Sequence, residues 1–178
     1  MEKFGVIVGR FQVPKLTHGH RWLISQAREN FDEILILVGD TKIQENNYKR
    51  MDSHDPYPFE FRKKMIRSEF PEVMIMRFED VGNLKIWNQK LDNLLETMNL
   101  GEYYLVGSRD SFVYNYDGKY KKYIIESPFK EVSGTGIRDL NYQEVSKPSF
   151  TPSTDFLKGV LWALQEKERL ENLNCDGE

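Results

Sequence analysis

Short apolar runs alternate with segments of helical periodicity along most of the chain, and this alternation restricts the fold more than any other feature. The runs KFGVIVGRF and DEILILVGD, residues 3–11 and 32–40, are rich in β-branched residues. Such runs are typical of parallel strands that are buried on both faces. Residues 18–31 lie between them, and their apolar helical face consists of Trp22, Leu23, Ala27 and Phe31. The three segments together predict a strand–helix–strand unit.

The same alternation continues further along the chain. It predicts helices over residues 58–70 and 84–98 and strands over residues 73–80, 102–108 and 122–127. Strands that alternate with helices form a parallel sheet with right-handed crossovers. We therefore expect the α/β class: a Rossmann-like doubly wound parallel sheet with helices on both faces, whose ligands bind beyond the carboxyl ends of the strands.

The length of the chain favours one domain. Its 178 residues, of which 39% are hydrophobic, are enough for one buried core. We expect a single domain over residues 1–178 that ends in an amphipathic helical segment at about 153–172. The polar segment 40–57 is long for a connection, and it is interpreted either as a lid over a site or as an ordinary surface loop.

Composition excludes several classes of protein. Lys and Arg total 25 against 28 Asp and Glu, so no general basic field favours a nucleic-acid partner. No stretch approaches the ~20 apolar residues that span a membrane, and the N-terminus lacks the apolar stretch of a signal peptide, so we expect a cytoplasmic protein. The single cysteine, Cys175, permits neither a disulfide nor a cysteine-based zinc site within one chain.

The turn after the first predicted strand, GRFQVPKLTHGH, has the chemistry of an anion site. Thr17 to His20 fall at the start of the predicted helix, where free backbone N–H groups and the positive helix end favour anions. Gly9 and Gly19 permit close backbone approach, while Arg10 and His20 can donate hydrogen bonds. The turn matches neither GxxxxGK[ST] nor GxGxxG, and ordinary turn chemistry is the alternative interpretation.

A second stretch, VSGTGIRDL at residues 132–140, repeats this chemistry at another strand-to-helix transition. Ser133 and Thr135 are hydroxyl donors between glycines, and Arg138 follows in the first helical turn. Alone, this stretch would be explained equally well by a helix cap with an arginine paired to Asp139 or Glu144. Two anion nests at one edge of a sheet indicate a phosphate-bearing ligand.

These motifs resemble a known family. GRFQ with THGH, followed by VSGTGIR, resembles the nucleotidyltransferase superfamily that carries (H/T)xGH early and an ISSTxIR-like motif late. Within it the chain is most similar to archaeal-type nicotinamide mononucleotide (NMN) adenylyltransferases, and the segments DPYPFEFRKKMI and FEDVGNLKIW extend the likeness over most of the chain. Thr17 replaces the first histidine of the usual HxGH, and Gly82 and Leu84 replace asparagines, with Asn83 between them.

The resemblance implies transfer of AMP from ATP to the 5′-phosphate of NMN, giving NAD and pyrophosphate, with Mg²⁺ as cofactor. Its catalytic residues would be His20, Thr17, Arg138 and Arg10. The residues that would bind the nucleotide are Gly9, Phe11, Gln12, Gly19, Gly107, Ser108, Ser133 and Thr135. Those that would bind the NMN substrate are Trp87, Asp80 and Asn83, and no protein residue is expected to ligate a metal directly. Trp87 lies at helical spacing with Leu84 and Leu91, so a core residue is the alternative for it.

Physical chemistry agrees with such a reaction. An acceptor phosphate is already anionic at neutral pH, so the transfer needs no general base, and the sequence offers no obvious carboxylate dyad or nucleophile triad. Two alternatives remain: another transferase of the superfamily, such as a pantetheine-phosphate adenylyltransferase or a cytidylyltransferase, and a protein that senses ATP or NAD without turnover. The expected partners are small molecules, and relatives commonly assemble, so a homo-oligomer is expected.

Overall fold

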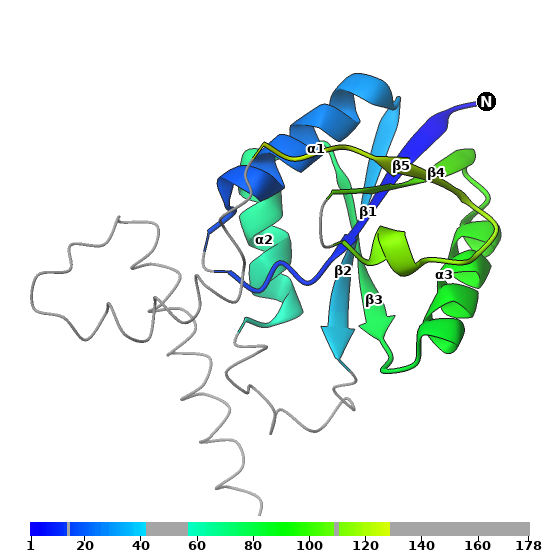
Figure 1. Ribbon diagram of the computed structural model, residues 1–178. Coiled ribbons are helices and arrows are strands. Elements are labelled where there is room, and N and C mark those ends of the chain that lie inside the picture. The colour runs from blue at the N-terminus through cyan, green and yellow to red at the C-terminus, as the bar shows by residue number, and fades with distance from the viewer. Residues whose placement is uncertain (14, 42–56, 109–110, 129–178) are drawn as a thin grey trace, which may run out of the picture.

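A five-stranded sheet with helices on both faces forms the described part of the chain, which in this computed structural model comprises residues 1–13, 15–41, 57–108 and 111–128 (Figure 1). The strands are β1 (Lys3–Gly9), β2 (Glu33–Thr41), β3 (Met74–Asp80), β4 (Glu102–Gly107) and β5 (Lys121–Ile124). The helices are α1 (His18–Asn30), α2 (Phe59–Glu69) and α3 (Leu84–Met98), with a 3₁₀ turn η2 (Phe112–Asn115).

All neighbouring strands are parallel, in the order β3-β2-β1-β4-β5. The chain first builds outward from β1 through β2 to β3 and then returns to β4 on the other side of β1. The expected α/β fold is therefore confirmed. Because the strand order reverses between β1 and β4, a crevice for ligands is expected where these two strands end.

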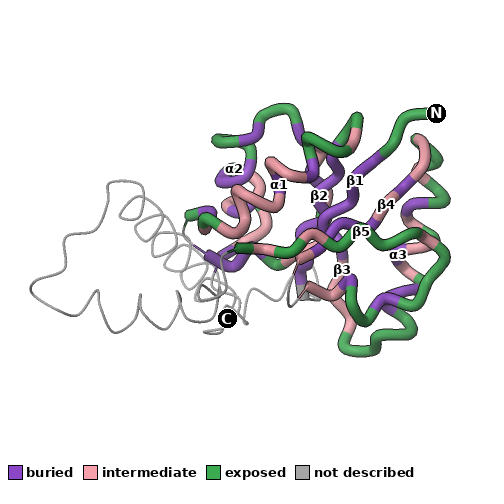
Figure 2. The backbone as a smooth tube through the Cα atoms, turned by 45° about the horizontal axis from the view of Figure 1, so that its top comes forward, coloured by how far each residue is buried: buried purple, intermediate pink, exposed green. Residues whose placement is uncertain are grey.

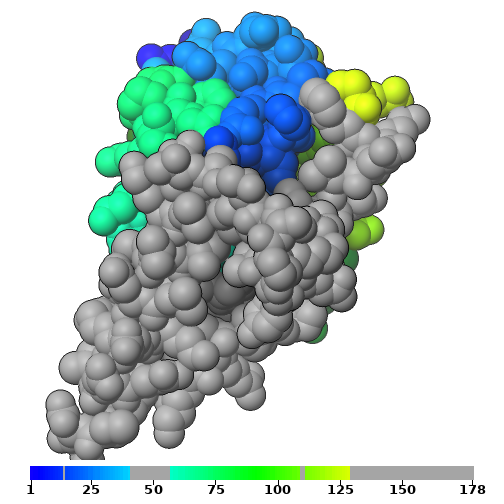
Figure 3. Space-filling model, turned by 90° about the vertical axis from the view of Figure 1, so that its left-hand side faces the viewer, coloured from blue at the N-terminus to red at the C-terminus, as the bar shows by residue number. Residues whose placement is uncertain are grey.

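Successive side chains of the central strands point to opposite faces of the sheet and pack into two separate hydrophobic cores. Ile7 packs with Ile24 of α1 and Ile66 of α2 on one face of the sheet. Val6 packs with Leu91 of α3 on the other. Figure 2 shows that the buried residues run along the middle strands. On the face turned toward the viewer in Figure 3, α1 (blue) and α2 (green) lie side by side, and the Arg21–Glu69 ion pair joins them. A sheet covered on both faces explains why its strands have continuous apolar sequences.

Periodicity predicted the element boundaries closely, but the predicted apolar face of residues 18–31 was partly wrong. The predicted helix over residues 84–98 has the observed bounds of α3, while the buried face of α1 is centred on Ile24 and Ala27 and leaves Trp22 only partly buried. Arg62, which its charge suggests is a surface residue of α2, is fully buried. The aromatic stretch at residues 112–123 contains η2 and most of the parallel strand β5.

Several predictions concern residues outside the described ranges. These are most of the polar segment 40–57, the second nest at residues 132–140 and the helical segment at about 153–172. Within the described ranges, no helix has the length and apolar character needed to cross a membrane.

Candidate nucleotide site

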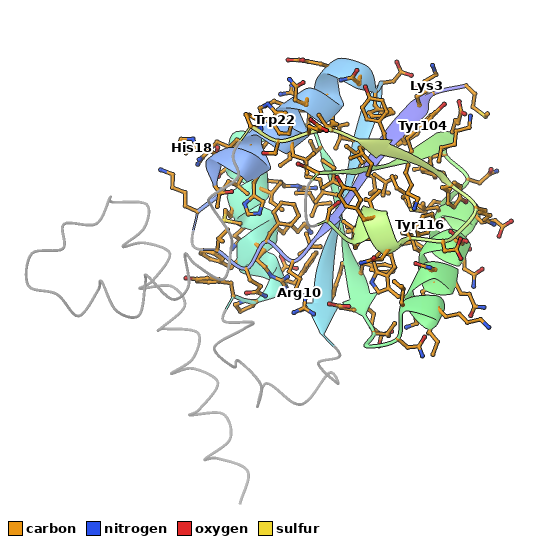
Figure 4. The ribbon with its side chains drawn as sticks, in the orientation of Figure 1. Lys3, Arg10, His18, Trp22, Tyr104 and Tyr116 are labelled. Carbon is orange, nitrogen blue, oxygen red and sulfur yellow. The ribbon has the colours of Figure 1, made fainter. Side chains whose placement is uncertain are left out.

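The carboxyl ends of the strands bring polar side chains from distant parts of the sequence to one edge of the sheet. Arg10 follows β1, Asp40 lies near the end of β2, Asp80 ends β3 and Ser108 follows β4. In Figure 4, Arg10 lies at the edge where the arrowheads of β2 and β3 end, and Lys3 lies at the opposite edge. The predicted anion turn is therefore at the edge where parallel sheets bind ligands.

A capping box fixes the start of α1. The Oγ1 of Thr17 accepts a hydrogen bond from the backbone N–H of His20 at 3.1 Å, and the N–H of Thr17 donates to Nδ1 of His20 at 3.2 Å. Threonine is a strong N-cap residue because its hydroxyl satisfies an N–H that the helix leaves free. Nδ1 of His20 accepts from a backbone N–H, so the proton of the neutral ring is carried on Nε2.

His20 is neutral at physiological pH. Its ring packs against the ring of Phe11, with centroids 5.0 Å apart, and this contact joins the turn after β1 to the start of α1. Burial, together with the nearby positive charge of Arg21, lowers the pKa of His20 to about 4. The side chain can therefore bind an anion through one Nε2–H donor without carrying a charge of its own.

This pKa predicts how stability depends on pH. The pKa of the folded state, about 4, lies below the ordinary value of 6.5, so the unfolded chain takes up the proton first as pH falls. The contribution of His20 to the free energy of unfolding is complete above pH 6.5 and is lost as pH falls toward 4. Urea denaturation of the wild type and of His20→Gln across this range should show a difference in stability that shrinks at low pH. A constant difference would contradict the assignment.

The turn after β1 is held in an unusual backbone conformation. Phe11 has a φ of 51°, in the left-handed region that residues with a Cβ seldom adopt. A Cβ at Gly9 would lie 3.0 Å from Cε2 of the Phe11 ring, so glycine there makes room for this aromatic side chain. At Gly19 the nearest atom to an added Cβ would be Oγ1 of Thr17 at 3.7 Å, which leaves space beside the cap. Strain of this kind is typical of ligand sites.

Gln12 ties the turn to the entry of α2. Its side-chain Nε2 donates to the carbonyl of Tyr57 at 3.1 Å, and its Oε1 accepts from the N–H of Tyr57 at 2.9 Å. The amide therefore pairs with both backbone groups of one residue, and Gln12 is buried. The sequence suggested a nucleotide contact for Gln12, whereas the structure gives its side chain a role in holding the turn.

The residues expected to bind the acceptor have partners within the protein. Asp80 accepts hydrogen bonds from Nε and an Nη of Arg10 at 2.9 and 2.6 Å. Asn83 caps α3 by accepting from the N–H of Ile86 at 3.1 Å. The structure therefore unites Arg10 with Asp80 at the edge of the sheet and places Asn83 at the nearby helix start.

Trp87 lies in the core below this edge. It is 7% exposed and contacts the rings of Phe78 and Phe112 at centroid distances of 5.2 and 4.5 Å. Its position in the first turn of α3 follows the predicted helix, and these contacts give it the core role that its helical spacing suggested.

Unpaired polar atoms lie where β4 ends. Among the described residues, no partner is found for the buried hydroxyl oxygens of Ser108 and Ser111. A Cβ at Gly107 would lie 2.2 Å from Oγ of Ser111 and 2.6 Å from Cγ2 of Val113, so glycine is needed for packing. A buried hydroxyl without a partner is costly, and this pair lies at the reversal point of the strand order.

One important residue was missed by the sequence interpretation. Arg62 donates to the carbonyl oxygens of Arg10 and Gly39 and to the carboxylate of Asp40. Its spacing could have revealed this, because residues 62, 65 and 66 share one face of α2 and the last two are Met and Ile.

The site as described has the chemistry of an anion site rather than of a metal cage. It combines a helix N-terminus, a neutral imidazole donor and Arg10. In the described part of the chain, no group of three or more His, Cys, Asp or Glu side chains could hold a metal ion. The predicted phosphate ligands Ser133, Thr135 and Arg138 lie outside that part.

Comparison with known families agrees with this geometry. The family model described as Cytidylyltransferase-like matches residues 6–154. The chain belongs to this family. Membership confirms the nucleotidyltransferase superfamily expected from GRFQ, THGH and VSGTGIR, and it makes the chain a nucleotidyltransferase-type protein. No curated protein sequence matches the chain significantly.

Solved structures show the same fold at low identity. A bifunctional NMN adenylyltransferase/ADP ribose pyrophosphatase from Francisella tularensis, complexed with AMP and a manganese ion, is 21% identical with a TM-score of 0.63, over 86% of this chain and 45% of that one. NadR protein in complex with NAD and AMP-PNP is 17% identical with a TM-score of 0.55, over 81% and 43%. This chain therefore spans less than half the length of these proteins.

Proposed function

We propose that this chain is an NMN adenylyltransferase, which transfers AMP from ATP to the 5′-phosphate of NMN and releases pyrophosphate. The observation that carries the proposal is the start of α1, where a capping box holds a neutral His20 with its proton on Nε2. A donor held in this way at a helix N-terminus suits a phosphate of the nucleotide.

The reaction needs positioning and electrostatics more than proton transfer. The acceptor phosphate is already anionic, and negative charge moves to the leaving pyrophosphate as the bond to the α-phosphorus breaks. His20, with Arg138, is proposed to donate to the leaving phosphates, while Arg10 and the backbone at Phe11 meet the α-phosphate. Thr17 acts on His20 through the capping box. Mg²⁺ would be bound through the triphosphate, which it partly neutralises.

The nucleoside is proposed to lie at the strand reversal between β1 and β4. The buried hydroxyls of Ser108 and Ser111 are available there for hydrogen bonds with a base or ribose. The likeness to solved proteins described as NMN adenylyltransferases, one of them complexed with AMP, supports the choice of adenylyl transfer.

Product analysis tests the proposal. The protein is incubated with Mg-ATP and NMN, and the products are followed by phosphorus NMR and chromatography. Parallel reactions contain CTP, phosphopantetheine or nicotinic acid mononucleotide. Equal amounts of NAD and pyrophosphate are expected from ATP and NMN. Conversion only of another pair would assign the chain to a different transferase, and binding of ATP or NAD without any conversion would make it a nucleotide sensor.

A further inference from the structure

Arg62 is an arginine with no exposed surface, and its guanidinium group makes three hydrogen bonds at the carboxyl edge of the sheet. One Nη donates to the carbonyl oxygens of Arg10 and Gly39, both at 2.7 Å, and the other donates to Oδ1 of Asp40 at 2.8 Å. Arg10 follows β1, and Gly39 and Asp40 belong to β2. A side chain from α2 therefore links the carboxyl ends of β1 and β2.

The contact with Arg10 determines the direction of the next backbone donor. A trans peptide is planar, and its C=O and N–H groups point in opposite directions. The carbonyl of Arg10 points toward the buried Arg62, so the N–H of Phe11 in the same peptide points away from it. No acceptor for this N–H is found within the described ranges. It is thus a free donor in the turn, next to a residue whose ring contacts His20.

The guanidinium group is suited to this task because it is planar and offers several donors in fixed directions. Lysine places its donors on a single nitrogen, so it cannot reach two carbonyls and a carboxylate with the same geometry. Asp40 balances the buried charge and also pairs with Arg77 at 2.5 Å, whose side chain is 49% exposed. Two arginines therefore share Asp40, but only Arg62 contacts the turn.

Gln12 supports the same turn from its other side. Its side-chain amide pairs with the backbone of Tyr57, two residues before α2 begins. The residues on both sides of Phe11 are consequently anchored to α2 or its entry, which accounts for the retention of a left-handed φ at Phe11.

We propose that Arg62 is a positioning residue, which orients the peptide between Arg10 and Phe11 so that the Phe11 N–H donates to a phosphate of the bound nucleotide. The inference rests on the proposed function for the identity of that nucleotide, while the geometry itself requires only an oligophosphate anion. If the role of Arg62 were only structural, its replacement would lower the stability of the protein without changing how the Phe11 amide responds to the anion.

Backbone NMR of the whole chain tests the orientation without any turnover. The probe is inorganic tripolyphosphate, titrated while the Phe11 amide resonance is followed. In the wild type this amide proton should shift downfield on binding, as expected for a new hydrogen bond to an anion. If the Phe11 resonance stays in place while other resonances of the turn report binding, the proposal is overturned, whether or not any variant folds.

Arg62→Lys then tests the cause, with Arg77→Lys as the matched control on the same carboxylate. Arg62→Lys should weaken tripolyphosphate binding about tenfold or more and abolish the Phe11 shift, because a charge-assisted hydrogen bond is lost. Arg77→Lys should leave both unchanged. If Arg62→Lys is folded and keeps the shift, or if both variants lose it equally, Arg62 does not orient the peptide.

Kinetics separate this inference from the proposed function. With active enzyme, Arg62→Lys should raise the KM for ATP and leave the KM for the acceptor unchanged, since the Phe11 N–H is proposed to contact the nucleotide already in the ground state. If the wild type converts no substrate but shows the Phe11 shift, the proposed function fails and the role of Arg62 stands. If the wild type is active but shows no Phe11 shift, the proposed function stands and the role of Arg62 fails.

Discussion

Replacing His20 by alanine is expected to lower turnover by about 10²- to 10³-fold, which corresponds to about 2.7–4 kcal/mol of lost transition-state stabilisation. The Nε2–H of His20 is held by two interactions of the capping box and by the ring of Phe11, so it needs no reorganisation when charge develops on the phosphates. Such preorganised donors are worth far more than mobile ones. The measurement is the steady-state rate of NAD formation from Mg-ATP and NMN.

His18→Ala provides the matched control for this variant. His18 is exposed, is the first residue of α1 and lies two positions from His20, so its replacement tests the general effect of losing an imidazole from this helix end. The control should retain nearly full activity. His20→Ala should also keep its fold, because Thr17 can still cap α1 through the backbone N–H of residue 20. Equal losses in both variants would contradict a specific role for His20.

Local patterns in the sequence were enough to predict the elements that position the site. Strands buried on both faces have continuous apolar runs, and α3 has apolar residues at helical spacing, so both are recognisable without tertiary information. The start of α1 was also predicted, because Thr17 to His20 follow an apolar strand and precede a helical pattern, whereas the capping box between Thr17 and His20 was not.

The contacts that hold the turn could not be predicted in this way. Arg62 and Gln12 are polar residues whose partners are backbone groups 52 and 45 residues away, and no local pattern identifies such partners. A charged residue is rarely buried, so composition alone favours the surface for Arg62. The tautomer of His20 likewise depends on a hydrogen bond to Nδ1 that only the structure shows.

Trp87→Ala should lower the free energy of unfolding by about 3–5 kcal/mol, the usual cost of removing a large buried aromatic side chain. The indole lies between Phe78 and Phe112 and is 7% exposed, so its removal leaves a cavity and breaks two aromatic contacts. The measurement is urea denaturation monitored by far-ultraviolet circular dichroism.

Leu84→Ala is the control for Trp87, since Leu84 starts the same helix but is 50% exposed. Its replacement should change stability by less than about 0.5 kcal/mol. A Trp87→Ala protein of wild-type stability that has lost only its affinity for NMN would show that the indole serves the ligand rather than the core. Loss of stability with unchanged NMN affinity in the molecules that remain folded would assign it to the core. Loss of both stability and NMN affinity would show that the acceptor binds against residues of the hydrophobic core.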